Sequence, residues 1–76
     1  MMSREQIEKI ARDFQLTVKE RTDKLLEEDC KMYTHLGIDS TPQEKQEVKD
    51  TSKIIYEQIK GFNEEVGHSL LEAFDE

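Results

Sequence analysis

The sequence predicts an all-α protein built as a long antiparallel two-helix hairpin. Apolar residues recur every three or four positions along two long stretches, and alternation with a period of two is absent. The only proline, Pro42, lies five residues after Gly37, and the stretch between them is the one clear turn. A chain of 76 residues has room for one small domain. We therefore expect a single domain over residues 1–76, with its turn at 37–41.

The first helix is expected over about residues 3–36. Ser3 can accept a hydrogen bond at the helix N-terminus, and Gln6, three residues later, completes a capping box. Gly37 can end the helix by adopting the left-handed conformation. At about 100° per residue, the helix wheel gathers the apolar residues into one stripe. This stripe contains Ile7, Ala11, Phe14, Val18, Leu25, Met32 and Leu36.

The second helix is expected over about residues 42–74. Thr41 is the predicted N-cap, Pro42 suits the first helical position and Glu44 is placed to complete a capping box. Gly61 and Gly67 each weaken a helix interior by about 1 kcal/mol relative to alanine. The apolar spacing continues through both glycines, so one helix is predicted, and whether they kink it stays open. The stripe contains Val48, Ile55, Ile59, Phe62, Val66, Leu70 and Ala73.

Both predicted helices also carry apolar residues outside their stripes. Two helices alone would leave these side chains in water, at a cost of about 25 cal/mol per Å² of apolar surface. We therefore expect two hairpins to pair as a homodimer that completes a four-helix bundle. A different protein supplying the missing helices is the alternative. The residues expected to support self-association are Leu26, Tyr33, Leu70, Leu71 and Phe74.

The charge of the chain argues against nucleic acid as a partner. Eleven Lys and Arg residues stand against 18 Asp and Glu residues, for a formal charge of −7, and nucleic-acid binding depends mainly on neutralising phosphates with basic side chains. A dimer in which the basic residues of the first helix line up remains the least favoured alternative. Those residues are Arg4, Lys9, Arg12, Lys19 and Lys24.

No pattern in the sequence predicts catalytic, cofactor-binding or metal-binding residues, and we do not expect an enzyme. Glu65 and His68 have the Glu-x-x-His spacing of di-iron bundles, but the helix wheel turns both away from the apolar stripe. Cys30 and His35 are five residues apart, so on one helix they point in different directions. Motifs for phosphate loops, paired-cysteine zinc sites and Ser-His-Asp sets are absent.

Two further observations predict where the protein works. No apolar run approaches the roughly 20 residues that span a bilayer, so we expect no membrane association. Cys30 is the only cysteine, so it cannot form a disulfide within the chain. A reducing compartment suits such a thiol, and we expect a cytoplasmic protein.

The function expected from these features is that of a small acidic interaction protein: a regulator, adaptor or inhibitor that binds a protein partner, one with a basic surface. Exposed apolar residues beside charges of a single sign are typical of contact surfaces. The expected contact residues are Ile54, Tyr56, Glu57, Glu72 and Asp75. The alternative is an architectural subunit that assembles into a larger helical structure through its apolar flanks.

Overall fold

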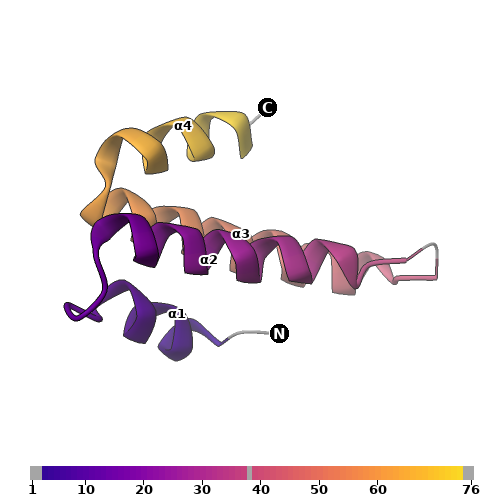
Figure 1. Ribbon diagram of the computed structural model, residues 1–76. Coiled ribbons are helices and arrows are strands. Elements are labelled where there is room, and N and C mark those ends of the chain that lie inside the picture. Colours follow the sequence, from indigo (N-terminus) through magenta and orange to yellow (C-terminus); the bar gives the residue numbers. More distant parts are fainter. Residues whose placement is uncertain (1–2, 38, 75–76) are drawn as a thin grey trace.

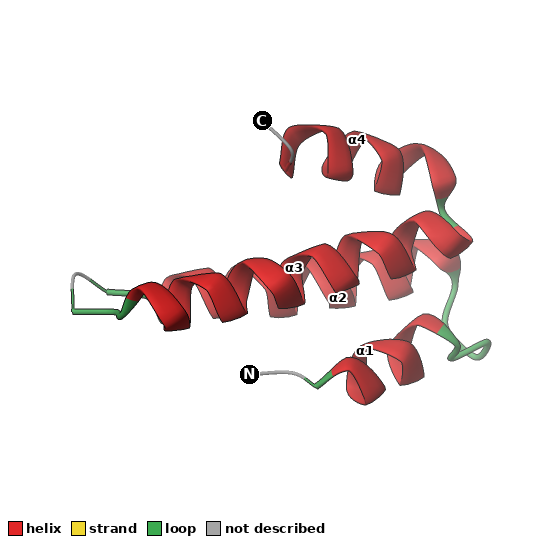
Figure 2. Cartoon of the chain, turned by 180° about the vertical axis from the view of Figure 1, so that it is seen from behind, coloured by secondary structure: helices red, strands yellow, loops and turns green. Residues whose placement is uncertain are grey.

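The computed structural model describes residues 3–37 and 39–74, and this part of the chain contains four α-helices and no strand (Figures 1 and 2). The helices are α1 (Arg4–Ala11), α2 (Val18–Thr34), α3 (Pro42–Phe62) and α4 (Glu64–Phe74). The predicted all-α class is confirmed. The predicted bounds of 3–36 and 42–74 are wrong, because each long helix is divided in two.

The four helices form three layers. Helices α2 and α3 lie side by side and run antiparallel, and α1 and α4 flank this pair on opposite sides (Figures 1 and 2). Helix α1 packs on both α2 and α3, whereas α4 packs on α3 alone among the described helices. Because α1 and α4 fold back, the chain measures 39 × 24 × 17 Å. A straight helix over residues 42–74 would by itself reach about 50 Å at 1.5 Å per residue.

The first break lies between Ala11 and Val18 and is caused by a helix start inside the predicted helix. The Thr17 hydroxyl accepts a hydrogen bond from the Glu20 amide at 3.1 Å, and the Glu20 carboxylate accepts one from the Thr17 amide at 2.9 Å. This capping box is visible in the sequence as Thr-x-x-Glu, and it prevails over the apolar spacing. Phe14 and Val18, predicted to face the core, are 84% and 40% exposed as a result.

The starts of α1 and α3 follow the sequence signals to different degrees. Ser3 and Gln6 form the predicted capping box. Thr41 caps α3 with Pro42 in its first turn, but only half of the capping box predicted with Glu44 is present, the bond from the Glu44 amide to the Thr41 hydroxyl. Helix α2, however, ends at Thr34 with His35 as its C-cap. Gly37 does not have a positive φ, so the predicted left-handed closure is wrong. Its amide instead donates a hydrogen bond to the Ser40 hydroxyl at 2.8 Å, which stabilises the turn.

The second break falls on one residue, Asn63, which has φ −142° and ψ 78° and separates α3 from α4. The turn brings the two helices very close together. A Cβ atom added at Gly67 would overlap the backbone of Lys60, whereas one added at Gly61 would meet no atom within 4 Å. Gly67 is therefore required by the fold-back of α4, and Gly61 is not.

The core comes from the predicted stripes, but only from three of the helices. Among residues 3–37 and 39–74, its seven buried apolar side chains are Ile7, Ala11, Leu25, Met32, Val48, Ile55 and Ile59. Of the described residues of α4, only Gly67 is buried. Helix α4 thus covers the core from outside without contributing a buried side chain to it.

Candidate functional site

A buried polar cluster joins α2 to α3. Asp29 on α2 is only 7% exposed, and its two carboxylate oxygens accept hydrogen bonds from the Ser52 hydroxyl at 2.6 Å and the Tyr56 hydroxyl at 2.7 Å. These bonds stabilise a carboxylate that burial would otherwise destabilise. Ser52 is itself fully buried, so its hydroxyl is out of reach of a substrate. The cluster is therefore a structural link between the two long helices.

Tyr56 extends this link to α4. Its ring meets the ring of Phe74 edge to face, with centroids 6.0 Å apart and an interplanar angle of 80°. Edge-to-face pairs are favourable because the positive ring edge of one partner meets the negative face of the other. Tyr56 is half-buried and contacts residues of both α2 and α4, so three helices meet at this side chain.

The environment of Tyr56 predicts a loss of stability in alkaline solution. Burial raises the pKa of Tyr56 from 10.0 to about 12; the Asp29 carboxylate contributes to the rise, and the Ser52 hydroxyl opposes it. The folded state therefore holds the phenol proton more tightly than the unfolded chain. The contribution of this proton to the free energy of unfolding is fully present below pH 10 and is lost as the pH rises through about 12.

Denaturant titrations at a series of pH values measure how the free energy of unfolding depends on pH. We expect the Tyr56→Phe chain to lack the alkaline loss of stability that the Tyr56 phenol causes. Phenolate absorbance in a Tyr33→Phe chain, which retains Tyr56 as its only tyrosine, reports the pKa directly. The same pH dependence in Tyr56→Phe as in the unmodified chain would show that Tyr56 is not its source.

Helix α4 presents an apolar surface that the fold leaves incompletely covered. It is the most apolar of the four helices, and its large apolar side chains are all half-buried. We call these side chains, Val66, Leu70, Leu71 and Phe74, the α4 surface. Val66 and Leu70 pack against the core cluster, whereas Leu71 is not among the residues packed there.

The residues expected to bind a protein partner differ in their exposure to solvent and in their contacts. Ile54 is half-buried and packs against the core, so it is less exposed than the helix wheel predicts. Tyr56 is the junction described above, and Glu57 is exposed. Glu72 is exposed, and its Oε1 atom lies 3.0 Å from Nε2 of His68. Asp75 lies outside the described residues.

The residues expected to support self-association lie on two helices. Leu70, Leu71 and Phe74 belong to the α4 surface. Leu26 and Tyr33 lie on α2, where Leu26 is half-buried against the core and Tyr33 is 40% exposed. The structure therefore places three of the five residues on one short helix, with Tyr56 in contact with its last described residue.

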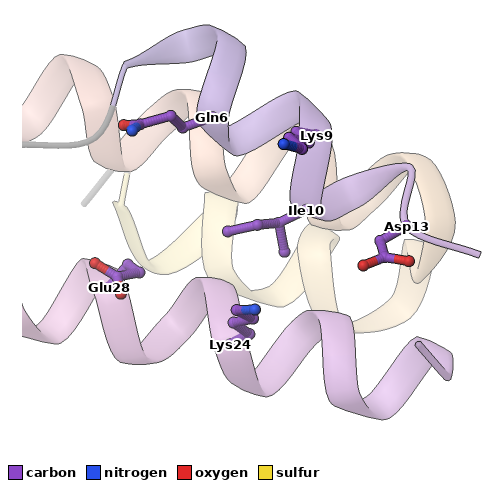
Figure 3. A pocket seen from close by; sticks show the side chains of 6 residues that line it. All are labelled: Gln6, Lys9, Ile10, Asp13, Lys24 and Glu28. Carbon is purple, nitrogen blue, oxygen red and sulfur yellow. The ribbon is translucent and has the colours of Figure 1, made fainter. Parts of the chain in front are cut away.

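A groove of about 430 Å³ lies between α1 and α2, and Figure 3 shows the side chains around it. Lysine and carboxylate side chains from both sides of the groove surround Ile10. Because the two positive and two negative charges balance, the groove does not favour a ligand of either sign. The lining residues are Gln6, Lys9, Ile10, Asp13, Lys24 and Glu28.

A smaller hollow of about 250 Å³ lies beside the turn between α2 and α3. Met32, Leu36 and Val48 line it with apolar side chains, and the carboxylates of Glu44 and Glu47 lie at the same hollow, together with His35. An apolar side chain flanked by basic groups would match this lining, because the acidic pair attracts positive charge.

The described residues bring together no set of ligands for a metal ion. No group of three or more His, Cys, Asp or Glu side chains converges within residues 3–37 and 39–74. Glu65 and His68 are both exposed, as the helix wheel predicts. Cys30 is exposed as well.

None of the described helices has the combination of length and apolar character needed to cross a membrane.

The breaks also change the interpretation of the basic residues of the first stretch. Arg4 and Lys9 lie on α1, Arg12 follows it, and Lys19 and Lys24 lie on α2. The single helix on which they were expected to align is therefore divided.

Comparisons with models of protein families, with curated proteins and with solved structures find no match to this chain.

Proposed function

We propose that this protein acts by binding other protein chains, and that one of its partners is a second copy of itself. The observation that supports this most is the α4 surface. The most apolar of the described helices packs on only one of the others, and none of its described side chains is buried. Burying the remaining apolar surface against another chain would stabilise the assembly by about 25 cal/mol per Å², which favours self-association to a homodimer in which helices of two chains pack as a bundle.

The role of this assembly would be that of a regulator, adaptor or inhibitor with a protein partner of basic surface. The hollow beside the turn supports this choice of partner, because the carboxylates of Glu44 and Glu47 line it. The formal charge of −7 acts in the same direction, by raising the rate of encounter with basic proteins. The expected contact residues Glu57 and Glu72, which are both exposed, add to this acidic character.

An architectural subunit is the second candidate. The exposed ring of Phe14, in the connection between α1 and α2, supports it because it lies outside the α4 surface. A chain with two separate apolar contact regions can form contacts that do not close into a dimer and so continue to larger assemblies. Light scattering separates the two candidates: a limiting mass of two chains favours the dimer, and growth with concentration favours the architectural role.

Leu71→Glu tests self-association through α4. A carboxylate at this half-buried position opposes the burial of α4 between chains, because the charge would have to leave water. We expect the mass measured by light scattering to fall to that of one chain, and the helical circular dichroism to stay unchanged, since Leu71 is not packed in the core cluster.

Ala73→Glu is the matched control, because it adds the same charge to an exposed position of the same helix. We expect it to leave the mass unchanged. If both variants stay dimeric, or if the unmodified chain is a monomer at every concentration, self-association through the α4 surface is wrong.

A further inference from the structure

The connection between α3 and α4 is a hinge of one residue. The Asn63 amide donates to the Ile59 carbonyl at 2.6 Å, and the Asn63 carbonyl accepts from the Gly67 amide at 2.9 Å. A continuous helix would also pair the amides of residues 64–66 with the carbonyls of residues 60–62. The break at Asn63 gives up these bonds, and a change at this one residue would restore them.

The apolar pattern is compatible with a straight helix through the hinge. Ile59, Phe62, Val66 and Leu70 follow one another at intervals of three or four, so they would form one stripe on a helix over residues 42–74. The fold-back, in contrast, depends on Gly67 having no side chain, since an added Cβ atom would overlap the backbone of Lys60. Local sequence therefore favours the straight form, and the contacts of α4 with α3 favour the folded form.

We propose that α4 exchanges between two copies of the chain: α3 and α4 straighten into one helix, and each α4 packs on the α3 of the other copy. A second copy is the occupant that this surface fits, because an identical helix reproduces the contacts that α4 makes within one chain, including Tyr56 with Phe74. Since α3 and α4 are antiparallel neighbours, the two straight helices would cross antiparallel near Asn63. The inference rests on the self-association proposed above and specifies its form.

Exchange and folding-back compete on nearly equal terms. The contacts that α4 makes with α3 occur in both forms, so they cancel in the comparison, and any further burial of the α4 surface where the two copies meet favours the exchanged form. The exchanged form regains the helix bonds across Asn63, and the folded form avoids the loss of freedom on association. The equilibrium between the folded monomer and the exchanged dimer therefore depends on protein concentration. It also depends on the close approach of Gly67 to Lys60 in the folded form.

Gly67→Ala and Gly61→Ala form a matched pair that tests the exchange. Both add one methyl group and raise helix propensity equally, but only the Gly67 substitution introduces an overlap in the folded form. In the exchanged form the helices belong to different chains, so they can move apart to relieve it. We expect Gly67→Ala to lower the dimer dissociation constant about tenfold or more relative to Gly61→Ala, as measured by light scattering over a range of concentrations.

Asn63→Leu supplies a second variant that adds no side chain at Gly67. It places a good helix former in the break, so we expect the same shift towards the dimer. If Gly67→Ala unfolds and Asn63→Leu remains as monomeric as Gly61→Ala, α4 has no alternative position and the proposal is wrong.

An isotope-filtered NOE measurement on a mixture of labelled and unlabelled chains identifies the form of the dimer. Exchange predicts contacts between Tyr56 of one chain and Phe74 of the other. A dimer in which this ring contact occurs only within each chain would overturn the exchange and leave the proposed self-association standing. Monomers in all variants at all concentrations would overturn both.

Discussion

Replacing Arg21 with alanine is expected to lower the free energy of unfolding by about 3 kcal/mol. Arg21 is 8% exposed, and its guanidinium donates hydrogen bonds to the Ala11 carbonyl at 3.1 Å and the Leu16 carbonyl at 3.2 Å. The same group lies 5.1 Å from the ring centroid of Phe62 and 5.4 Å from that of Phe14. Without Arg21, the Ala11 carbonyl at the end of α1 and the Leu16 carbonyl in the loop before α2 would lose this hydrogen-bond donor.

Denaturant titration followed by circular dichroism measures this effect. The expected loss is a large share of the total, since a domain of this size is stable by only about 4–11 kcal/mol. Arg12→Ala is the matched control, because Arg12 is exposed and lines the same hollow as Arg21. We expect it to change stability by less than about 0.5 kcal/mol. Equal effects of the two substitutions would contradict the role assigned to Arg21.

Asp29→Ala is expected to cost about 2–4 kcal/mol, because it leaves two hydroxyl groups without their acceptor. The Ser52 hydroxyl is fully buried and the Tyr56 hydroxyl partly so. Asp29→Asn should cost less than the alanine change, since one oxygen remains to accept a hydrogen bond. Asp23→Ala is the control on the same helix: Asp23 is exposed and pairs with Lys19 at 3.9 Å, so its loss should be nearly neutral.

A double-mutant cycle separates the buried link from general effects of lost packing. If Asp29 and Tyr56 act through one hydrogen bond, Asp29→Ala and Tyr56→Phe together should cost less than the sum of the single changes. Strict additivity would show that the 2.7 Å contact between these groups contributes nothing to stability. The cycle can be measured with the same denaturant titrations.

The candidate site was predictable from the sequence only in part. Leu70, Leu71 and Phe74 were expected at a surface of contact because they lie outside the apolar stripe or near the helix end, and the structure places them on one incompletely covered helix. Ile54 was expected to be exposed, yet it packs against the core. A helix wheel gives the direction of a side chain relative to its own helix, but neighbouring helices decide how much of that side chain is covered.

The sequence by itself determined the helical class, the main turn and the composition of the core. Caps such as Ser3 with Gln6 and Thr41 before Pro42 are local signals, because the groups that interact lie within three residues of each other. The seven apolar side chains that are buried in the described part of the chain all come from the predicted stripes, because three- and four-residue spacing holds wherever the chain stays helical.

Only the tertiary structure decided that the second helix breaks at Asn63 and which polar groups become buried. At Thr17 the capping box with Glu20 is a local signal for the break, whereas at Asn63 the packing of α4 on α3 selects it. The hydrogen bonds of Arg21 and Asp29 to Ala11, Ser52 and Tyr56 join residues 10, 23 and 27 positions apart. Partners at such separations meet only when the helices pack, so no local pattern can identify them.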